Sequence, residues 1–288
     1  MNLTLKNELK SGRFVITAEI CPPRGTDTSD FVKKARLLKG KIAAANVTDN
    51  QRAVMRLSSL ACSVLLLKEG IDPVFQMTCR DRNRIALQSD IMGAWVLGVR
   101  NILALTGDHV ISGDHREAKA VFDIDSVQLV AVIDTLNHGK NMKDTELRGA
   151  TDFLIGAVVA PEANPWEPEE IKFGKKVSAG AKFFQTQAIF DMEKFKRFFD
   201  GAESSGAKIL GGILLLKSAK MANYLNANVP GVNVPQNLIE EIEGSKDQLA
   251  KGIEIASRQL RELKKFCHGA HIMAIGQEES VIKIIEGA

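Results

Sequence analysis

Short apolar segments of β type alternate with amphipathic helical segments along the whole chain. Eight of the apolar segments predict strands, at residues 13–20, 42–48, 73–78, 101–106, 153–159, 183–189, 209–216 and 271–275. Most are nearly continuous in apolar residues, which is typical of parallel strands buried on both faces. The alternation predicts a single (β/α)8 TIM barrel over residues 1–288. A doubly wound sheet is the alternative, and the absence of a GxGxxG motif after any strand weighs against it.

Several helices between these strands carry recognisable start signals. Residues 26–30 open one helix, and residues 122–125 precede another. Pro235 stands where the first residue of a third helix is expected, because its missing N–H is not needed there. Ser245 is predicted to cap a long helix whose apolar residues, from Leu249 to Leu263, recur in steps of three and four.

Composition and charge narrow the functional classes. The 288 residues are 45% hydrophobic and 25% charged with a net charge of +3, which is ordinary globular composition. Basic residues are interleaved with acidic ones, so we expect no nucleic-acid binding. The longest apolar stretch, 209–216, is too short for a membrane span, and residues 1–10 lack an apolar leader segment. A cytoplasmic protein is therefore expected. The four cysteines form no CxxC pair, and neither they nor the histidines predict a metal site.

Polar residues follow most of the predicted strands. Because a barrel places its chemistry at the carboxyl ends of the strands, we expect these side chains to converge on one mouth. Glu19, which follows an apolar strand and precedes two prolines, is interpreted either as an acid with a raised pKa or as a plain ion-pair partner. Gln185 and Gln187 lie on one face of their strand, so at least one of them is expected to be structural.

Seven motifs in register resemble the methylenetetrahydrofolate reductase family, whose members are flavin-dependent barrels. The resemblance covers most of the chain. Its residues are Thr17-Ala18-Glu19-Ile20-Cys21-Pro22-Pro23, Asn46-Val47-Thr48, Met77-Thr78-Cys79, the segment from Gly98 to Thr106-Gly107-Asp108, Pro161-Glu162, the segment from Lys176 to Ala181, and the segment from Thr186 to Asp191.

The resemblance implies reduction of 5,10-methylenetetrahydrofolate to 5-methyltetrahydrofolate through a bound flavin. It implies that Glu19 is the general acid, that Asp108 lies beside the flavin and contacts the pterin, and that Gln187 binds the folate. Further flavin contacts are implied at Thr48, Asp49, Gln51, Gln76, Thr106, Gly107, Asn164, Glu169 and Lys176. The family also implies self-association into an oligomer.

Four positions depart from the family pattern. Gln76 replaces a histidine, Thr106 an arginine and Ala219 an aromatic residue, and Glu278 falls near the place of an expected arginine. FMN is therefore an alternative to FAD, and direct use of NAD(P)H is in doubt. A partner subunit is one candidate for the electron donor. Two other functions stay open: a folate- or flavin-binding subunit that is active only with such a partner, and a flavin-free lyase with Lys217 as the Schiff-base lysine.

Overall fold

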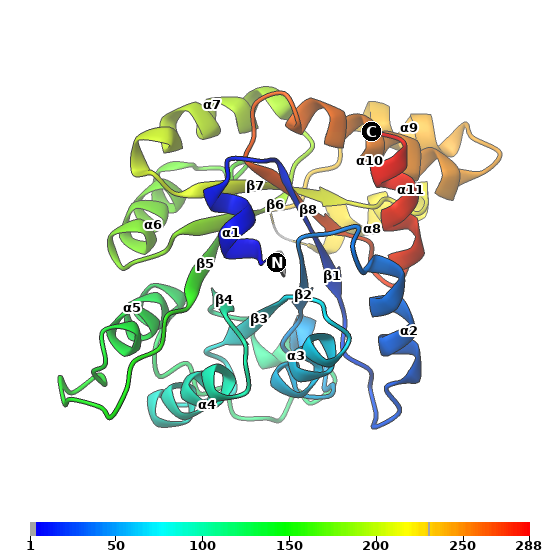
Figure 1. The fold of residues 1–288 in the computed structure, drawn as a ribbon. Coiled ribbons are helices and arrows are strands. Elements are labelled where there is room, and N and C mark those ends of the chain that lie inside the picture. The colour runs from blue at the N-terminus through cyan, green and yellow to red at the C-terminus, as the bar shows by residue number, and fades with distance from the viewer. Residues whose placement is uncertain (1–3, 230) are drawn as a thin grey trace.

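A closed ring of eight parallel strands forms the centre of the molecule (Figure 1). The computed structural model describes residues 4–229 and 231–288. Each strand pairs with the next, and β1 pairs with β8, which closes the ring. The prediction of a (β/α)8 barrel is confirmed, and this closure excludes a doubly wound sheet. The strands are β1 (Val15–Ile20), β2 (Ala44–Val47), β3 (Pro73–Thr78), β4 (Asn101–Leu105), β5 (Leu154–Val159), β6 (Phe183–Ala188), β7 (Lys208–Leu214) and β8 (Gly269–Met273).

Helices surround the ring on its outer side (Figure 1). They are α1 (Leu5–Lys10), α2 (Ser29–Leu38), α3 (Ser59–Lys68), α4 (Arg84–Val96), α5 (Ser126–Asn137), α6 (Glu167–Ser178), α7 (Met192–Ala202), α8 (Ala219–Asn228), α9 (Gln236–Glu243), α10 (Gln248–Leu263) and α11 (Glu278–Glu286). Short 3-10 helices occupy Gln51–Ala53, Val110–Ser112 and Glu203–Ser205. Across the described ranges, no helix combines the length and the apolarity needed to cross a membrane.

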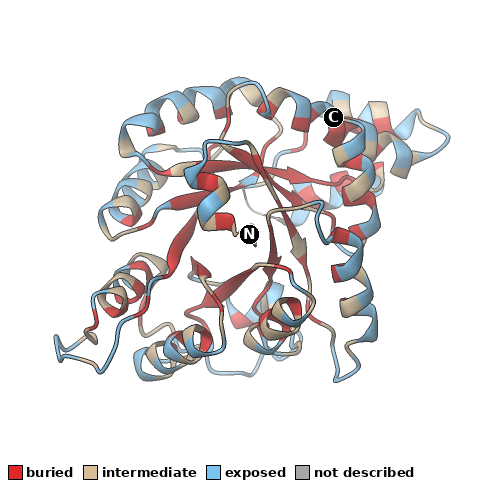
Figure 2. Cartoon of the chain, viewed as in Figure 1, coloured by how far each residue is buried: buried red, intermediate tan, exposed pale blue. Residues whose placement is uncertain are grey.

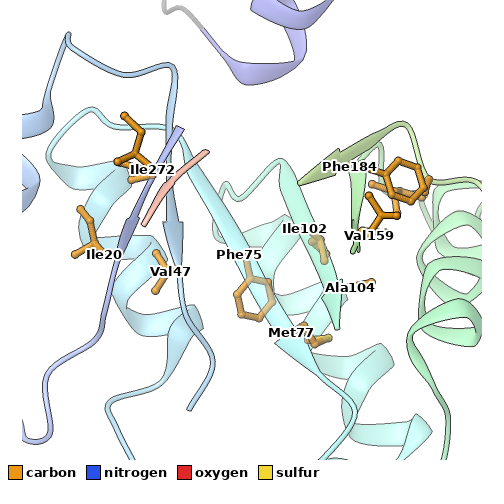
Figure 3. Packing of buried hydrophobic residues seen from close by; sticks show 14 of the residues in the cluster. Ile20, Val47, Phe75, Met77, Ile102, Ala104, Val159, Phe184 and Ile272 are labelled. Atoms are coloured by element: carbon orange, nitrogen blue, oxygen red, sulfur yellow. The ribbon is translucent and has the colours of Figure 1, made fainter. Parts of the chain in front are cut away.

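The main hydrophobic core lies between the strands and the helices. The strands are almost entirely buried, whereas the helices bury only their inner faces (Figure 2). Outward-facing strand residues such as Ile20, Phe75 and Ile272 belong to one continuous cluster with residues of the helices (Figure 3). Because neighbouring residues of a strand point to opposite faces, this packing directs the intervening residues of each strand into the barrel.

The inside of the barrel is closed at its amino end. Helix α1 lies across the centre of the ring in Figure 1. Its Leu5 and Leu9 pack on an apolar layer to which seven strands contribute one residue each: Val15, Ala44, Val74, Leu103, Leu154, Phe183 and Leu210. The only end left for a site is therefore the carboxyl end, as the barrel rule predicts.

A polar layer lies above this apolar layer. Gln185 exchanges hydrogen bonds with the side-chain amide of Asn46 at 2.7 and 3.0 Å, and its Nε2 also donates to the Thr17 hydroxyl at 3.1 Å. The Thr17 hydroxyl lies 3.0 Å from Nδ1 of His271, and burial lowers the pKa of His271 to about 3. The four side chains satisfy one another, so Gln185 is the structural member of the glutamine pair.

The helix starts differ from expectation in two cases. Asp125 caps α5 and forms a capping box with Gln128, at the place the sequence indicates, whereas Pro235, expected as the first helical residue, takes the N-cap position before α9. Ser245 does not cap the long helix α10. Asp247 does so, because its carboxylate accepts the N–H of Ala250 at 3.0 Å, while the Ser245 hydroxyl donates to the Asp247 carbonyl oxygen. Ser245 and Asp247 are both suitable N-cap residues and lie close together in sequence, so the sequence alone does not show which of them caps α10.

Replacing Asp247 with alanine is expected to lower the free energy of unfolding by about 1 kcal/mol, the usual effect of losing an N-cap. The matched substitution Ser245→Ala is expected to have a smaller effect, because it leaves the first turn of α10 capped. Urea unfolding followed by circular dichroism measures both. A larger loss in Ser245→Ala would contradict the assignment of the cap.

Candidate functional site

Glu19 lies at the carboxyl end of β1, half-buried in the mouth of the barrel. Its Oε1 accepts a hydrogen bond from Nε2 of Gln51 at 3.1 Å. Burial raises the pKa of Glu19 from 4.5 to about 7; the bond from Gln51 opposes this shift and the negative charge of Glu278 adds to it. A carboxylic acid that still holds its proton near neutral pH can act as a proton donor.

Glu278 is the neighbour of Glu19 that reasoning from the sequence missed. It is the first residue of α11 and is only 3% exposed, and its carboxylate pairs with Lys34 of α2 at 3.1 Å. Lys34 also pairs with the exposed Asp30 at 2.9 Å. The available signal was topological: in a closed barrel, the residues that follow the last strand lie beside the first strand.

Asp49, an implied flavin contact, lies just below the mouth and is 3% exposed. Its carboxylate accepts the N–H and the hydroxyl of Thr78, both at 2.9 Å, and two guanidinium bonds from Arg82 at 3.0 Å. The Ser59 hydroxyl adds a longer bond of 3.4 Å. Protein donors thus occupy both oxygens, and Asp49 ties the end of β2 to the end of β3.

Asp108 is exposed near the start of the loop that follows β4. Its Oδ2 accepts the N–H of Arg52 at 3.0 Å, and its carbonyl oxygen accepts a bond from the buried Arg80. Gly107 before it has a φ of +92°, and a Cβ there would lie 2.9 Å from Cβ of Thr78. Glycine therefore lets this loop approach β3 and directs Asp108 over the mouth.

Several polar groups around the mouth keep free hydrogen-bonding capacity. Gln76 is 7% exposed, and the described residues provide no hydrogen-bond partner for its amide. The exposed Asn164 likewise makes no hydrogen bond to the described ranges, and the Thr48 hydroxyl donates only to the sulfur of Cys21, at 3.4 Å. The exposed Thr106 accepts the N–H of Ser126 at 3.2 Å and keeps its own proton available.

Glu169 and Lys176 belong to α6, and both bond to the backbone at the end of β5. Glu169 accepts the N–H of Ala160 at 3.0 Å, and the ammonium of Lys176 donates to the carbonyl oxygen of Val158 at 2.6 Å. Burial lowers the pKa of Lys176, while the charge of Glu169 opposes that shift. The pair fixes the end of β5 and places one amine close to the site.

The two glutamines of β6 are separated by the structure. Gln185 is buried in the polar layer, whereas Gln187 is the only exposed residue of the strand. Helices cover the outer side of the barrel, so an exposed side chain at this end of β6 faces the mouth. The structure therefore brings Gln187 together with Glu19, Asp108 and the free polar groups.

Other expected residues are engaged elsewhere. The ammonium of Lys217, the proposed Schiff-base lysine, donates to the carbonyl oxygen of Ile275 at 3.0 Å. Ala219 is the first residue of α8 and is 6% exposed, so this position offers no aromatic ring. All four cysteines are free, and three of them are buried. Within residues 4–229 and 231–288, no group of three His, Cys, Asp or Glu side chains is arranged to hold a metal ion.

The mouth is suited to a planar, polar heterocycle. A flavin ring presents alternating N–H and carbonyl groups along one edge, and an amide can pair with either kind. The unpartnered amide of Gln76 and the half-used hydroxyl of Thr48 offer such pairing from adjacent strands. These residues fit a flavin ring, and Glu19, whose pKa is raised to about 7, lies on the next strand of the ring.

Sequence comparison gives one consistent result. The family model described as methylenetetrahydrofolate reductase matches residues 4–288. The 5,10-methylenetetrahydrofolate reductase of Pectobacterium carotovorum subsp. carotovorum is 27% identical over 243 residues, which are 81% of this chain and 74% of that protein. The reductase of Escherichia coli (strain K12) is 25% identical over 246 residues, 82% of this chain and 76% of that one.

Comparison with solved structures supports the fold. An uncharacterised protein of Clostridium thermocellum, described as binding two copies of 5-methyl-5,6,7,8-tetrahydrofolic acid, superposes with a TM-score of 0.68 at 16% identity, over 98% of this chain and 97% of that one. A 2,3-dimethylmalate lyase also superposes, with a TM-score of 0.55 at 10% identity over 98% of this chain and 82% of its own. At such low identity these likenesses establish the barrel and not the chemistry.

Proposed function

The chain belongs to the methylenetetrahydrofolate reductase family, and from this we propose that it reduces 5,10-methylenetetrahydrofolate to 5-methyltetrahydrofolate at the carboxyl mouth of its barrel, with Glu19 as general acid and a bound flavin as cofactor. The observation that carries the proposal is the half-buried carboxyl of Glu19, whose pKa is raised to about 7 in a mouth lined with unpaired polar groups. The 5-methyltetrahydrofolate bound by the Clostridium thermocellum neighbour is the expected product.

We assign the residues of the mouth the roles that the family resemblance implies. Glu19 donates its proton to a nitrogen of the methylene bridge, which opens the bridge to a reactive iminium on the folate. Asp108 and Gln187, both exposed at the mouth, accept and donate hydrogen bonds to the pterin. Glu19 takes its proton back from water between turnovers. The flavin, when bound, supplies the hydride that reduces the iminium carbon.

The residues proposed to hold the flavin fall into two groups. Thr48, Gln76, Thr106, Gly107, Asn164 and Asp108 offer free or exposed polar groups, so they are proposed as direct contacts. Asp49, Gln51, Glu169 and Lys176 already bond to the protein, and we propose that they support the walls of the site. FAD is the proposed form, with FMN as the alternative. Electrons are proposed to come from a partner subunit, since α8 begins with alanine and offers no ring to stack on a nicotinamide.

The first experiment combines a spectrum with a single-turnover reaction. Purified protein is given FAD or FMN, its visible spectrum is recorded, and the flavin released by heat is identified by chromatography. The dithionite-reduced protein is then mixed with methylenetetrahydrofolate in a stopped-flow instrument. We expect the flavin bands to bleach with dithionite and to return with the folate.

Other results would remove parts of the proposal. If the protein takes up neither flavin, the flavin-dependent mechanism is contradicted and the hypothesis of a flavin-free lyase remains. Reduced flavoprotein that the folate does not reoxidise favours a binding subunit. Reduction by NADH or NADPH as fast as by dithionite would contradict the need for a partner.

The charge on Glu278 is expected to add to the effect of burial on the pKa of Glu19. The wild-type rate of reoxidation by the folate should fall as pH rises through about 7, because the reaction needs Glu19 in its acid form. Glu278→Gln removes a negative neighbour that disfavours the carboxylate of Glu19. The pKa of Glu19 should then fall, and the decline in rate should begin at lower pH. Stopped-flow rates from pH 5.5 to about 9 measure this shift.

The adjacent substitution Glu279→Gln is the matched control. Glu279 is exposed on the same helix turn and does not contribute to the pKa of Glu19. Its pH profile should match that of the wild type. A shift to higher pH in Glu278→Gln, or equal shifts in both variants, would show that the charge of Glu278 is not felt at Glu19.

A further inference from the structure

The carboxyl end of β6 is irregular. Gln185 pairs with Leu210 of β7, but the next pair in register joins Ala188 to Gly212. Thr186 and Gln187 therefore face a single residue, Gly211, which is the arrangement of a β-bulge. Bulges redirect side chains, and this one lies at the mouth and includes the exposed Gln187.

The hydroxyl of Thr186 holds the bulge together. It accepts the N–H of Gly212 at 2.8 Å and donates to the carbonyl oxygen of Gln187 at 2.7 Å. Thr186 is 3% exposed, so water does not compete for these bonds. The hydroxyl replaces the backbone partner that the irregular register takes away from Gly212, and it fixes the peptide group of Gln187 at the same time.

Gly212 of β7 lies directly against the bulge. A Cβ at this position would lie 2.6 Å from the carbonyl oxygen of Gln187, and it would also crowd the carbonyl oxygen of Thr186. Only glycine allows the two strands to approach so closely at the bulge.

The segments on both sides of the bulge are anchored. Before it, Gln185 is locked to Asn46 in the polar layer. After it, Oε1 of Glu162 accepts the N–H groups of Phe190 and Asp191 at 2.6 and 2.7 Å, and the carbonyl oxygen of Ile189 accepts a bond from Gln259 of α10 at 3.0 Å. The backbone of Gln187 is therefore fixed by hydrogen bonds within and around the bulge, whereas its side chain is exposed.

We propose that Thr186 is a positioning residue for folate recognition, whose hydroxyl holds the β6 bulge, together with Gly212, so that the amide of Gln187 is presented to the pterin. This rests on the proposed function, in which Gln187 binds the folate. Thr186 itself touches no ligand, and its contribution is to spare Gln187 the reorganisation that binding would otherwise require.

The test compares Thr186→Val, which keeps the shape and removes both hydrogen bonds, with Thr186→Ser, which keeps them. The Kd for 5-methyltetrahydrofolate is measured on the flavin-loaded protein, and the KM and kcat for methylenetetrahydrofolate are measured with a dithionite-coupled assay. Loss of two neutral hydrogen bonds predicts a Kd and KM about tenfold higher in Thr186→Val. Flavin content should be unchanged, the fall in kcat should be smaller, and Thr186→Ser should restore wild-type values.

A double-mutant cycle shows whether Thr186 acts through Gln187. Gln187→Ala should weaken folate binding, and adding Thr186→Val to it should weaken binding no further. An unchanged Kd in Thr186→Val, or a full additional loss in the double variant, would overturn the inference. If Thr186→Val does not fold, Thr186→Cys, a weaker hydrogen-bonding group of similar size, replaces it, and an unchanged Kd there would overturn it equally. Wild-type protein that binds no folate would instead refute the proposed function.

Discussion

Replacing Glu19 with glutamine is expected to slow the oxidation of the reduced enzyme by methylenetetrahydrofolate by about 10²- to 10⁴-fold, the usual contribution of a general acid. Glutamine has the same shape and can still bond to Gln51, but it has no acidic proton to give to the methylene bridge. The ground-state site is otherwise intact, so flavin content and the Kd for 5-methyltetrahydrofolate should change little. Stopped-flow mixing of the dithionite-reduced variant with the folate measures the step directly.

The pH dependence provides a second readout for the same variant. In the wild type the rate should decline through about pH 7, the pKa of Glu19, whereas the residual rate of Glu19→Gln should not follow that titration. Glu279→Gln, with an exposed carboxylate outside the mouth, is the matched control and should keep the wild-type rate. If Glu19→Gln retained a rate within threefold of the wild type, the general acid would have to be another group.

The barrel itself was predictable because its strands are buried on both faces. Near-continuous apolar segments appear in sequence as clear β signals, and all eight strands lie within two residues of the predicted ranges. The last strand starts earlier than expected, at Gly269. A Cβ at Gly269 would meet the carbonyl oxygen of Val15, so close approach to β1 selects a residue with no apolar signal.

Only those site residues that lie at or just after the end of a predicted strand could be predicted from the sequence. Glu19, Asp108 and Gln187 follow their strands directly, and the structure brings them to one mouth. The separation of Gln187 from Gln185 depends on a bulge, which a strict two-residue period cannot reveal. Glu278 lies at the other end of the chain from Glu19, so only closure of the barrel makes them neighbours.

Asp49 shows a further limit of reasoning from the sequence. Its position after β2 places it among the ligand contacts, yet the residues that occupy its carboxylate, Thr78 and Arg82, belong to the following strand and the loop after it. Spacing along the chain gives a residue's place at the mouth but not how many of its bonds the protein itself uses. That distinction decides whether a substitution affects binding or stability.

The Asp49→Ala substitution is accordingly expected to destabilise the fold by about 3–5 kcal/mol, the range for removing one partner of a buried ion pair. It leaves the half-buried guanidinium of Arg82 and the N–H and hydroxyl of Thr78 without their shared acceptor. Urea unfolding measures the loss. Asp90→Ala is the matched control, because Asp90 pairs with the same guanidinium at 3.1 Å but is 43% exposed. Exposed pairs of this kind contribute at most about 1 kcal/mol.

The same pair can be separated from simple packing by a double-mutant cycle. Removing Arg82 as well, in Asp49→Ala/Arg82→Leu, takes away the charge that Asp49→Ala leaves unpaired, so the double variant should lose less stability than the sum of the two single variants. Additive losses would mean that Asp49 stabilises the fold through Thr78 alone. Equal losses in Asp49→Ala and Asp90→Ala would mean that burial of the pair carries no weight. This second result would leave Asp49 without a structural role that Asp90 lacks and would favour direct contact between its carboxylate and the flavin.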